Sequence, residues 1–548
     1  MPKYVFVTGG VVSSLGKGIV AASIGLLLKS RGFSVAHQKL DPYLNIDPGT
    51  MNPKEHGEVY VTEDGAETDL DLGYYERFTG VQTSRNSSFS AGKIYDIILK
   101  KERKGGEYFG KTVQVVPHVV DEIQNAIRSA GTEKTDVIIV EIGGTVGDIE
   151  SFPFLEALRL FRQKEGYKDV YFIHVSLIPY LRKADEIKTK PTQHSVARLR
   201  EIGIIPNMLV CRSEKHLDNN VREKLGMFCS VDTSSVLESP DVENTIYECP
   251  IVFAGQNMDT QILDHFGLSY RAKQIDEWLE YIENITKIKE KITIALVGKY
   301  IEVPDAYKSI SEALVHTGTN LKVKVNIKMV DAEKLEANGK GDLSKAGNIL
   351  KDADGILVPG GFGDRGIEGK ITAVKYARVN KIPFFGICLG MQMAVIEFAR
   401  SVLGYEDACS RETDENTTHP VIALMNSQKE IVNKGGTMRL GSYPCKLARN
   451  SLVLKLYGEE SINERHRHRY EFNNEYREEF IKNGLSLSGL SPDGQLVEIV
   501  ELKDHPHFVG VQFHPEFKSR PIKPHPLFAG FIEAASSRRH SATENHEI

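Results

Sequence analysis

The fold is indicated first by residues 5–18, which read VFVTGGVVSSLGKG. The apolar start is typical of a buried strand, a loop rich in glycine and serine follows, and a helix is expected to begin near Ile19. Backbone N–H groups of such a loop point toward phosphate oxygens, and Lys17 adds a positive charge. The stretch therefore predicts an α/β domain that carries a phosphate site.

This loop differs from the common phosphate-binding pattern. Five residues rather than four separate Gly10 from Gly16, and Gly18 stands where Ser or Thr would hold Mg²⁺. Carboxylates elsewhere are then expected to hold the metal, and Glu141, at the end of an apolar strand, and Asp71 are the candidates. A glycine-rich turn beside solvated acids is the alternative.

Two α/β domains, each with a doubly wound, mostly parallel sheet, are expected. Short apolar runs alternate with longer amphipathic ones, and the pattern restarts at Lys291. Strands are expected at 3–8, 35–40, 136–142, 170–176, 207–211, 291–298, 355–359, 382–387 and 508–513. The predicted divisions are 1–269 for the first domain, 270–290 for a linking amphipathic helix, 291–535 for the second domain and 536–548 for a disordered tail.

The second domain contains a candidate nucleophile, Cys388, in the run FGICLGMQ at 385–392. Glycines two residues to either side allow a tight strand-to-helix turn, which exposes the thiol and leaves backbone N–H groups free for an oxyanion. A base is offered by His514 after an alternating strand. Glu516 lies two residues further along an extended chain, so it can orient the imidazole. A structural cysteine and an unrelated surface histidine are the alternative.

The composition is that of an ordinary water-soluble protein: 548 residues, 41% hydrophobic, 26% charged, with a net charge of −6. These values give no sign of bulk attraction to nucleic acid or to a membrane surface. The start of the chain has no long apolar segment, so no secretory signal is expected. The six cysteines are scattered without a C-x-x-C pair, which favours a reducing compartment, by default the cytoplasm.

A second polyphosphate site is suggested by lysines near expected strand ends. Lys39 ends the second strand, and the segment 188–194 reads KTKPTQH before a helix. A solvated, charged surface explains this pattern equally well.

Several of these motifs together resemble the CTP synthase family, from about residue 3 to residue 531. They are the loop at 9–18 and the segments 39–45, 141–151, 188–193, 385–392, 435–441 and 465–471. The resemblance implies a ligase of pyrimidine biosynthesis that fuses an amidoligase to a class I glutamine amidotransferase. It would convert UTP to CTP with ATP, Mg²⁺ and ammonia from glutamine, through a 4-phosphorylated UTP. It further implies activation by GTP, inhibition by CTP, a homotetramer and, in some members, filaments.

The resemblance also assigns residues. Cys388, His514 and Glu516 would form the catalytic triad, and His56 would lie near the ammonia passage. Lys308 and Arg439 are the implied GTP contacts, whereas His466, Arg467 and His468 are assigned no role, with surface charge as one interpretation of them. ATP would be bound by Ser14, Leu15, Gly16, Lys17, Gly18, Ile19 and Asp71, with Asp71 and Glu141 on Mg²⁺. UTP or CTP would be bound by Ser13, Asp148, Ile149, Glu150, Lys188, Thr189, Lys190, Pro191, Thr192, Gln193 and Lys224. Glutamine would be bound by Gly361, Leu389, Gly390, Met391, Gln392, Glu412 and Arg469.

Two other functions remain open at this point. One is a glutamine-dependent amidoligase that acts on a carboxylate, which would share the loop and the thiol turn. The other is a nucleotide-switched assembly protein similar to partitioning ATPases, with an inactive second domain.

Overall fold

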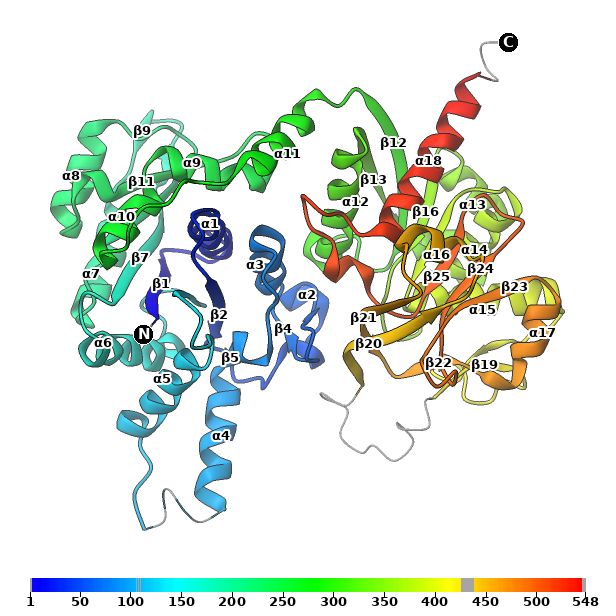
Figure 1. The fold of residues 1–548 in the computed structure, drawn as a ribbon, viewed down its shortest axis with the longest axis horizontal. Coiled ribbons are helices and arrows are strands. Elements are labelled where there is room, and N and C mark those ends of the chain that lie inside the picture. The colour runs from blue at the N-terminus through cyan, green and yellow to red at the C-terminus, as the bar shows by residue number, and fades with distance from the viewer. Residues whose placement is uncertain (1, 105, 107, 109, 425–437, 545–548) are drawn as a thin grey trace. The chain divides into compact units, whose positions relative to one another are not determined.

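The computed structural model describes residues 2–104, 106, 108, 110–424 and 438–544 (Figure 1). The chain divides into two compact units. The first unit comprises Met1–Pro48 and Asp71–Ile282, and the second comprises Gly49–Leu70 and Glu283–Ile548. The segment 49–70 thus packs with the second unit although it was expected in the first domain, because polar contacts distant in sequence hold it there.

The first unit is built on a seven-stranded sheet whose strands are all parallel. Five of its strands were expected from their apolar runs. In spatial order the strands are β11 (Val236–Pro240), β10 (Met208–Ser213), β7 (Val170–Leu177), β1 (Lys3–Gly10), β6 (Val137–Ile142), β2 (Val35–Asp41) and β5 (Ser88–Ser90).

Helices cover both faces of this sheet (Figure 1). Phe6 of β1 and Val140 of β6 share one hydrophobic core with Ile94, Ile123 and Phe161 of three helices, and α1 covers the opposite face. The helices of this unit are α1 (Lys17–Ser30), α3 (Asp71–Thr79), α4 (Ala91–Arg103), α5 (Val120–Arg128), α6 (Phe152–Glu165), α7 (Lys190–Glu201), α8 (Asn219–Cys229), α9 (Cys249–Gly255) and α10 (Met258–Phe266).

The expected linking helix is α11 (Asp276–Lys287), shorter than the predicted span 270–290. Trp278 is buried, and its Nε1 donates to the Tyr247 carbonyl oxygen at 2.9 Å. The ring of Trp278 also packs against Phe78. Its apolar face therefore anchors the start of α11 on the first unit.

The second unit contains a nine-stranded sheet. Five strands are parallel: β13 (Val323–Asp331), β12 (Glu290–Gly298), β16 (Gly355–Val358), β17 (Phe384–Ile387) and β25 (Phe508–Val511). All but β13 were expected. An antiparallel extension follows, formed by β24 (Val497–Leu502), β23 (Leu485–Leu490), β20 (Arg439–Leu447) and β21 (Ser461–His468). This extension was not expected, because β20 alternates buried with exposed residues and gives no continuous apolar run.

The remaining elements of the second unit surround this sheet. Its helices are α2 (Pro53–His56), α12 (Lys308–Asn320), α13 (Leu343–Leu350), α14 (Ile367–Val379), α15 (Leu389–Phe398), α16 (Leu452–Tyr457), α17 (Arg477–Lys482) and α18 (Pro526–Glu544). Short strands outside the large sheet include β3 (Tyr60–Val61), β4 (Glu67–Thr68), β18 (Cys409–Ser410), β19 (Pro420–Leu424) and β22 (Tyr470–Phe472).

The expected disordered tail is helical over most of its length. Helix α18 continues to Glu544, and only 545–548 lie outside the described residues. Ser536 donates to Glu290 at 2.6 Å, and His540 lies 3.1 Å from the same carboxylate. These contacts are made to a strand far away in the sequence, so the polar composition of the tail did not reveal them. None of the described helices has the length and apolar character needed to cross a membrane.

Candidate functional site

The turn between β17 and α15 holds Cys388 in the position expected of a nucleophile. Cys388 has φ 51° and ψ −103°, a conformation that side-chain-bearing residues rarely adopt, and its N–H donates to the Val511 carbonyl at 2.7 Å. A Cβ on Gly386 would lie 2.7 Å from the Gly390 carbonyl group, and one on Gly390 would lie 2.1 Å from the Val358 oxygen. Both glycines are therefore required by close backbone approach, as the sequence predicted.

His514 and Glu516 form a buried ion pair beside this turn. His514 Nδ1 lies 2.7 Å from Glu516 Oε1, and the imidazole stacks on Phe517. Burial acts to lower the pKa of His514, but Glu516 and Cys388 outweigh it and raise this pKa to about 10. A Cβ on Gly360 would approach both His514 Cε1 (2.9 Å) and Cys388 Cβ (3.5 Å). The three triad residues are thus brought together, with an imidazolium next to the thiol.

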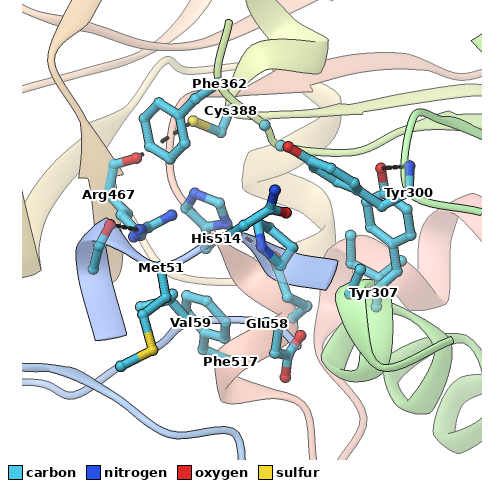
Figure 2. Close-up of a pocket in the computed structure, with 18 of the residues that line it drawn as sticks. Met51, Glu58, Val59, Tyr300, Tyr307, Phe362, Cys388, Arg467, His514 and Phe517 are labelled. Carbon is cyan, nitrogen blue, oxygen red and sulfur yellow. Dashed lines mark hydrogen bonds and ion pairs between the residues drawn. The ribbon is translucent and has the colours of Figure 1, made fainter. Parts of the chain in front are cut away.

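A cavity of about 420 Å³ opens in front of the triad, entirely within the second unit. Figure 2 shows Cys388 and His514 with Phe362, Arg467 and Met51 around this cavity. One wall is formed by Gly49–Pro53, Glu58 and Val59, a segment that sequence reasoning did not connect with the thiol. The candidate nucleophile is therefore enclosed partly by residues 49–59, which lie more than 300 positions earlier in the chain.

Of the residues expected to bind the oxyanion and glutamine, some line the cavity and others lie in the hydrophobic core. Gly361 lines the cavity, and a Cβ built on it would lie 3.7 Å from Leu389. Met391 is fully buried in the hydrophobic core, so only its backbone is available to a ligand. Leu389 and Gly390 are the first residues of α15, where N–H groups lack a partner within the helix. The helix start thus suits an oxyanion.

Glu412 and Arg469 lie near each other, as their expected roles require. Burial raises the pKa of Glu412, while the Gly363 N–H group, Lys299 and Arg469 act in the opposite direction. This places one carboxylate and one guanidinium in the neighbourhood of the loop at 361–363. The pair could hold the ammonium and carboxylate groups of an amino acid.

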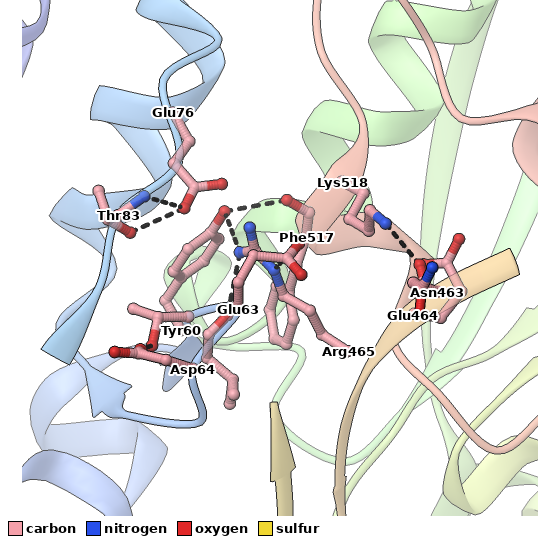
Figure 3. Close-up of polar contacts among 12 residues, drawn as sticks. Tyr60, Glu63, Asp64, Glu76, Thr83, Asn463, Glu464, Arg465, Phe517 and Lys518 are labelled. Atoms are coloured by element: carbon pink, nitrogen blue, oxygen red, sulfur yellow. Dashed lines mark hydrogen bonds and ion pairs between the residues drawn. The ribbon is translucent and has the colours of Figure 1, made fainter. Parts of the chain in front are cut away.

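Arg465 holds the segment 49–70 on the second unit. Its side chain is fully buried and donates to Glu63 Oε1, to the Tyr60 hydroxyl and to the Val61 carbonyl, each at 3.0 Å (Figure 3). Tyr60 in turn donates to the Phe517 carbonyl at 2.9 Å. The backbone carbonyl of Arg465 accepts from the His514 N–H at 2.8 Å. Arg465 therefore connects the segment to the histidine of the triad.

Arg467 forms a second connection of the same kind. Its Nε donates to Glu67 Oε1 at 2.8 Å and its Nη2 to the Gly49 carbonyl at 3.3 Å, while its guanidinium lies over the Phe362 ring. The Arg467 carbonyl is 3.7 Å from Cys388 Sγ. No role was assigned to Arg467 from the sequence, yet its side chain contacts the segment, as does that of Arg465 two residues earlier on β21.

His466 and His468, which were assigned no role from the sequence, are also buried. His466 Nδ1 lies 3.0 Å from His468 Nε2, and Arg439 lies 2.8 Å from Glu498 beside them. Burial lowers the pKa of His466 far below its ordinary value and that of His468 to about 3, so both are neutral. The glycine loop before Arg439 lies at 435–437, outside the described residues.

Two further predicted residues have local partners in the second unit. His56 Nε2 lies 3.1 Å from Asp69, and Lys308 lies 3.0 Å from Glu312. Lys308 begins α12, where Ser309 donates its N–H to Glu58 at 2.9 Å. Glu58 thus caps α12 and ties it to a wall of the cavity.

In the first unit, the predicted phosphate loop joins β1 to α1. Ser14 and Gly16 have φ values of 57° and 86°, and Ser13 and Ser14 are exposed. Lys17 Nζ donates to the Gly144 carbonyl at 2.9 Å, and burial lowers the pKa of Lys17. The loop and the lysine therefore lie at the carboxyl ends of β1 and β6, where parallel sheets bind ligands.

The two expected metal ligands converge on Lys39. Lys39 Nζ bonds to Asp71 and lies 3.1 Å from Glu141 Oε1, while Tyr75 donates to the other Glu141 oxygen. A Cβ on Gly18 would lie 2.3 Å from Asp71 Oδ1 and 3.4 Å from Glu141 Oε2. No group of three or more acidic, histidine or cysteine ligands occurs among the described residues. Two carboxylates beside a phosphate loop fit Mg²⁺, which usually takes its other ligands from phosphates and water.

The predicted pyrimidine-nucleotide residues follow β6 and β7. Asp148, Ile149 and Glu150 are exposed, whereas Thr192 is buried and bonds to Ser176 at 2.9 Å. A cavity of about 340 Å³ contains Pro191 together with Val11 and Thr145. Thr189, Lys190 and Gln193 lie at the start of α7, and Lys188 directly precedes it. Lys224 is exposed on α8, and no described contact joins it to this set.

Sequence reasoning missed Arg212, which lies near the phosphate loop. A Cβ on Gly16 would lie 3.4 Å from Arg212 Nη1, and Arg212 also pairs with Asp241 at 2.7 Å. Its place near the end of the expected strand 207–211 was an available signal, because ligand residues gather at that edge.

The comparisons with known proteins agree with this geometry. The family model described as CTP synthase N-terminus matches residues 3–268, and the model for class-I glutamine amidotransferase matches residues 302–534. A CTP synthase of Fibrobacter succinogenes is 57% identical over 98% of this chain and 94% of its own length. One from Clostridium kluyveri is 58% identical over 98% and 99%, and one from Caldanaerobacter subterraneus is 58% identical over 97% and 98%. The chain therefore belongs to the CTP synthase family.

Proposed function

We propose that this protein aminates UTP to CTP with ammonia taken from glutamine, and that ATP activates the uracil ring. As a member of the CTP synthase family it is a ligase of pyrimidine biosynthesis. The observation that carries the proposal is the Cys388–His514–Glu516 arrangement on a cavity, in a chain whose other unit holds a phosphate loop facing two carboxylates.

The glutaminase step uses the imidazolium–thiolate pair. The Cys388 thiolate attacks the carboxamide carbon, an S–C bond forms, and the carbonyl electron pair moves onto oxygen near the N–H groups that begin α15. The C–N bond then breaks, and His514 gives its proton to the departing nitrogen so that neutral ammonia leaves. Water then gives a proton to His514 and attacks the thioester carbon, the S–C bond breaks, and glutamate leaves with the imidazolium–thiolate pair restored.

Substrate glutamine is held at both of its charged ends in this proposal. Glu412 receives the α-ammonium and Arg469 the α-carboxylate, beside Gly361 and the backbone of 389–391. Gln392 completes the set. The positive charges of Lys299 and Arg469 act against burial on the pKa of Glu412 and so favour its carboxylate form, which supports this arrangement.

The synthetase step belongs to the first unit. The uracil 4-oxygen attacks the γ-phosphorus of ATP and ADP leaves; ammonia then adds to carbon 4 and phosphate departs with the original oxygen. Residues 14–19 would bind ATP, and Ser13, 148–150, 188–193 and Lys224 would bind UTP or inhibitory CTP. Asp71 and Glu141 would hold Mg²⁺, which neutralises charge on the phosphates when bound. Lys17 and Lys39 add positive charge where the phosphoryl group moves.

Ammonia must reach this step before it takes up a proton, since ammonium does not attack. The segment 49–70 supports such a path because it walls the glutaminase cavity and is followed in the chain by Asp71. We place His56 along this path, and Lys308 and Arg439 at a GTP activator site. The tetramer, filaments and a cytoplasmic location are part of the same proposal.

The test compares CTP formation from glutamine with CTP formation from added ammonia. Cys388→Ala should abolish CTP formation from glutamine and leave CTP formation from added ammonia near the wild-type rate. Cys409→Ala, which changes a buried cysteine of the same unit outside the cavity, should keep both activities. Loss of the ammonia-dependent reaction in Cys388→Ala alone would contradict the two-site assignment.

A further inference from the structure

Gln512 is a buried side chain that contacts the candidate nucleophile. It directly follows β25 and precedes His514 by two residues, and it is 1% exposed. Its Nε2 lies 3.6 Å from Cys388 Sγ, and its backbone N–H donates to the Glu498 carbonyl oxygen at 2.8 Å. Neither the triad nor the glutamine contacts assigned above include this side chain.

The neighbouring hydrogen bonds determine which end of the Gln512 amide faces the sulfur. The Tyr470 backbone carbonyl can only accept, so the Gln392 atom 3.0 Å from it must be the amide nitrogen. The same nitrogen lies 3.2 Å from the Gln512 amide oxygen and gives it a hydrogen. The oxygen of Gln512 is thereby occupied, and its NH₂ group must face Cys388 Sγ.

This network has a consequence for Gln392 as well. Both hydrogens of its NH₂ group are used, one on Tyr470 and one on Gln512. The only side-chain group that Gln392 can offer a ligand is its Oε1 acceptor. It therefore suits a donor group of the substrate, either the ammonium or the carboxamide NH₂.

We propose that Gln512 is a further catalytic residue that donates an N–H hydrogen bond to the Cys388 thiolate, and that Gln392 fixes the amide in that orientation. The proposal rests on the glutaminase function proposed above. A buried thiolate needs such donors because no water solvates it. His514 takes part in proton transfer at the sulfur, whereas the neutral Gln512 amide stabilises the negative charge on the sulfur without exchanging a proton with it.

The experiment is the pH dependence of Cys388 alkylation by iodoacetamide, followed by mass spectrometry of the peptide that contains it. In Gln512→Met, which keeps the length of the side chain but cannot donate, alkylation at pH 7 should slow about 10- to 100-fold, the range expected for one charge-assisted hydrogen bond. The midpoint of the profile should move about one to two pH units upward. Gln495→Met, at an exposed glutamine of the same unit, should match the wild type.

Gln512→Glu serves as a second variant of nearly identical shape. Its carboxylate cannot donate when ionised, so its alkylation profile should move upward at least as far as that of Gln512→Met. The far-UV circular dichroism spectrum of both variants should match that of the wild type, which shows that the chain is folded. An unshifted alkylation profile in either folded variant overturns the proposal, even if glutaminase activity falls. Failure of the proposed function itself would appear separately, as glutaminase activity retained by Cys388→Ser.

Discussion

Replacing Arg465 with methionine should separate glutamine hydrolysis from CTP synthesis. The guanidinium makes three hydrogen bonds to the segment 49–70, to Glu63, Tyr60 and Val61. Methionine keeps most of the side-chain volume but none of these bonds. The backbone carbonyl that binds the His514 N–H stays in place, so the triad keeps its support.

The free-energy cost of Arg465→Met depends on how deeply the ion pair between Arg465 and Glu63 is buried. Arg465 is fully buried whereas Glu63 is 23% exposed, so the carboxylate left behind can turn toward water. Breaking a buried pair usually costs about 3–5 kcal/mol, and this exposure favours the lower value of about 3 kcal/mol. That cost corresponds to roughly a hundredfold larger population with the segment detached.

The assay measures glutamate released and CTP formed in the same reaction. A detached segment opens the wall at 49–59, and ammonia released there takes up a proton from water. The ratio of CTP to glutamate should fall severalfold in Arg465→Met, while hydrogen exchange in 49–70 becomes faster. Arg449→Met, at an exposed arginine of the same unit, is the matched control. A wild-type ratio together with faster exchange would refute the reasoning.

Two further predictions concern the first unit. Lys17→Met should stop CTP formation from both glutamine and ammonia, because the phosphoryl transfer precedes amination; turnover with ammonia in this variant would remove Lys17 from the phosphate site. Burial, with a smaller effect of Lys17, lowers the pKa of His174 to about 3. The unfolded chain therefore binds this proton first, so stability is lost as the pH falls below about 6.5, by roughly 2 kcal/mol between pH 7 and pH 5. Between pH 7 and pH 5, the free energy of unfolding measured with urea should fall by about 2 kcal/mol less in His174→Gln than in the wild type. An equal fall in both proteins would contradict the prediction.

The parts of the protein that the sequence predicted correctly are encoded locally. The apolar run, glycines and lysine at 5–18 define a strand, loop and helix within one stretch, and the turn around Cys388 does the same. Parallel strands buried on both faces also leave continuous apolar runs, which is why most were found. Carboxylates at strand ends could be placed at one sheet edge without knowing any side-chain distance.

The parts that were missed depend on contacts between distant residues. Strand β20 of the antiparallel extension beyond β25 is only partly buried and carries no continuous apolar run, and α18 is held partly by Glu290. Arg467 looks like surface charge in a basic stretch, yet its partner Glu67 lies four hundred residues earlier.

The sequence by itself therefore determined the two α/β sheets and the strand–loop–helix at 5–18, and it supplied the candidate nucleophile and base, because each is a short-range pattern. Only the tertiary structure decided that 49–70 walls the cavity, and that Arg465 and Gln512 contact His514 and Cys388. Burial and long-range hydrogen bonding control those roles, and neither can be derived from spacing along the chain.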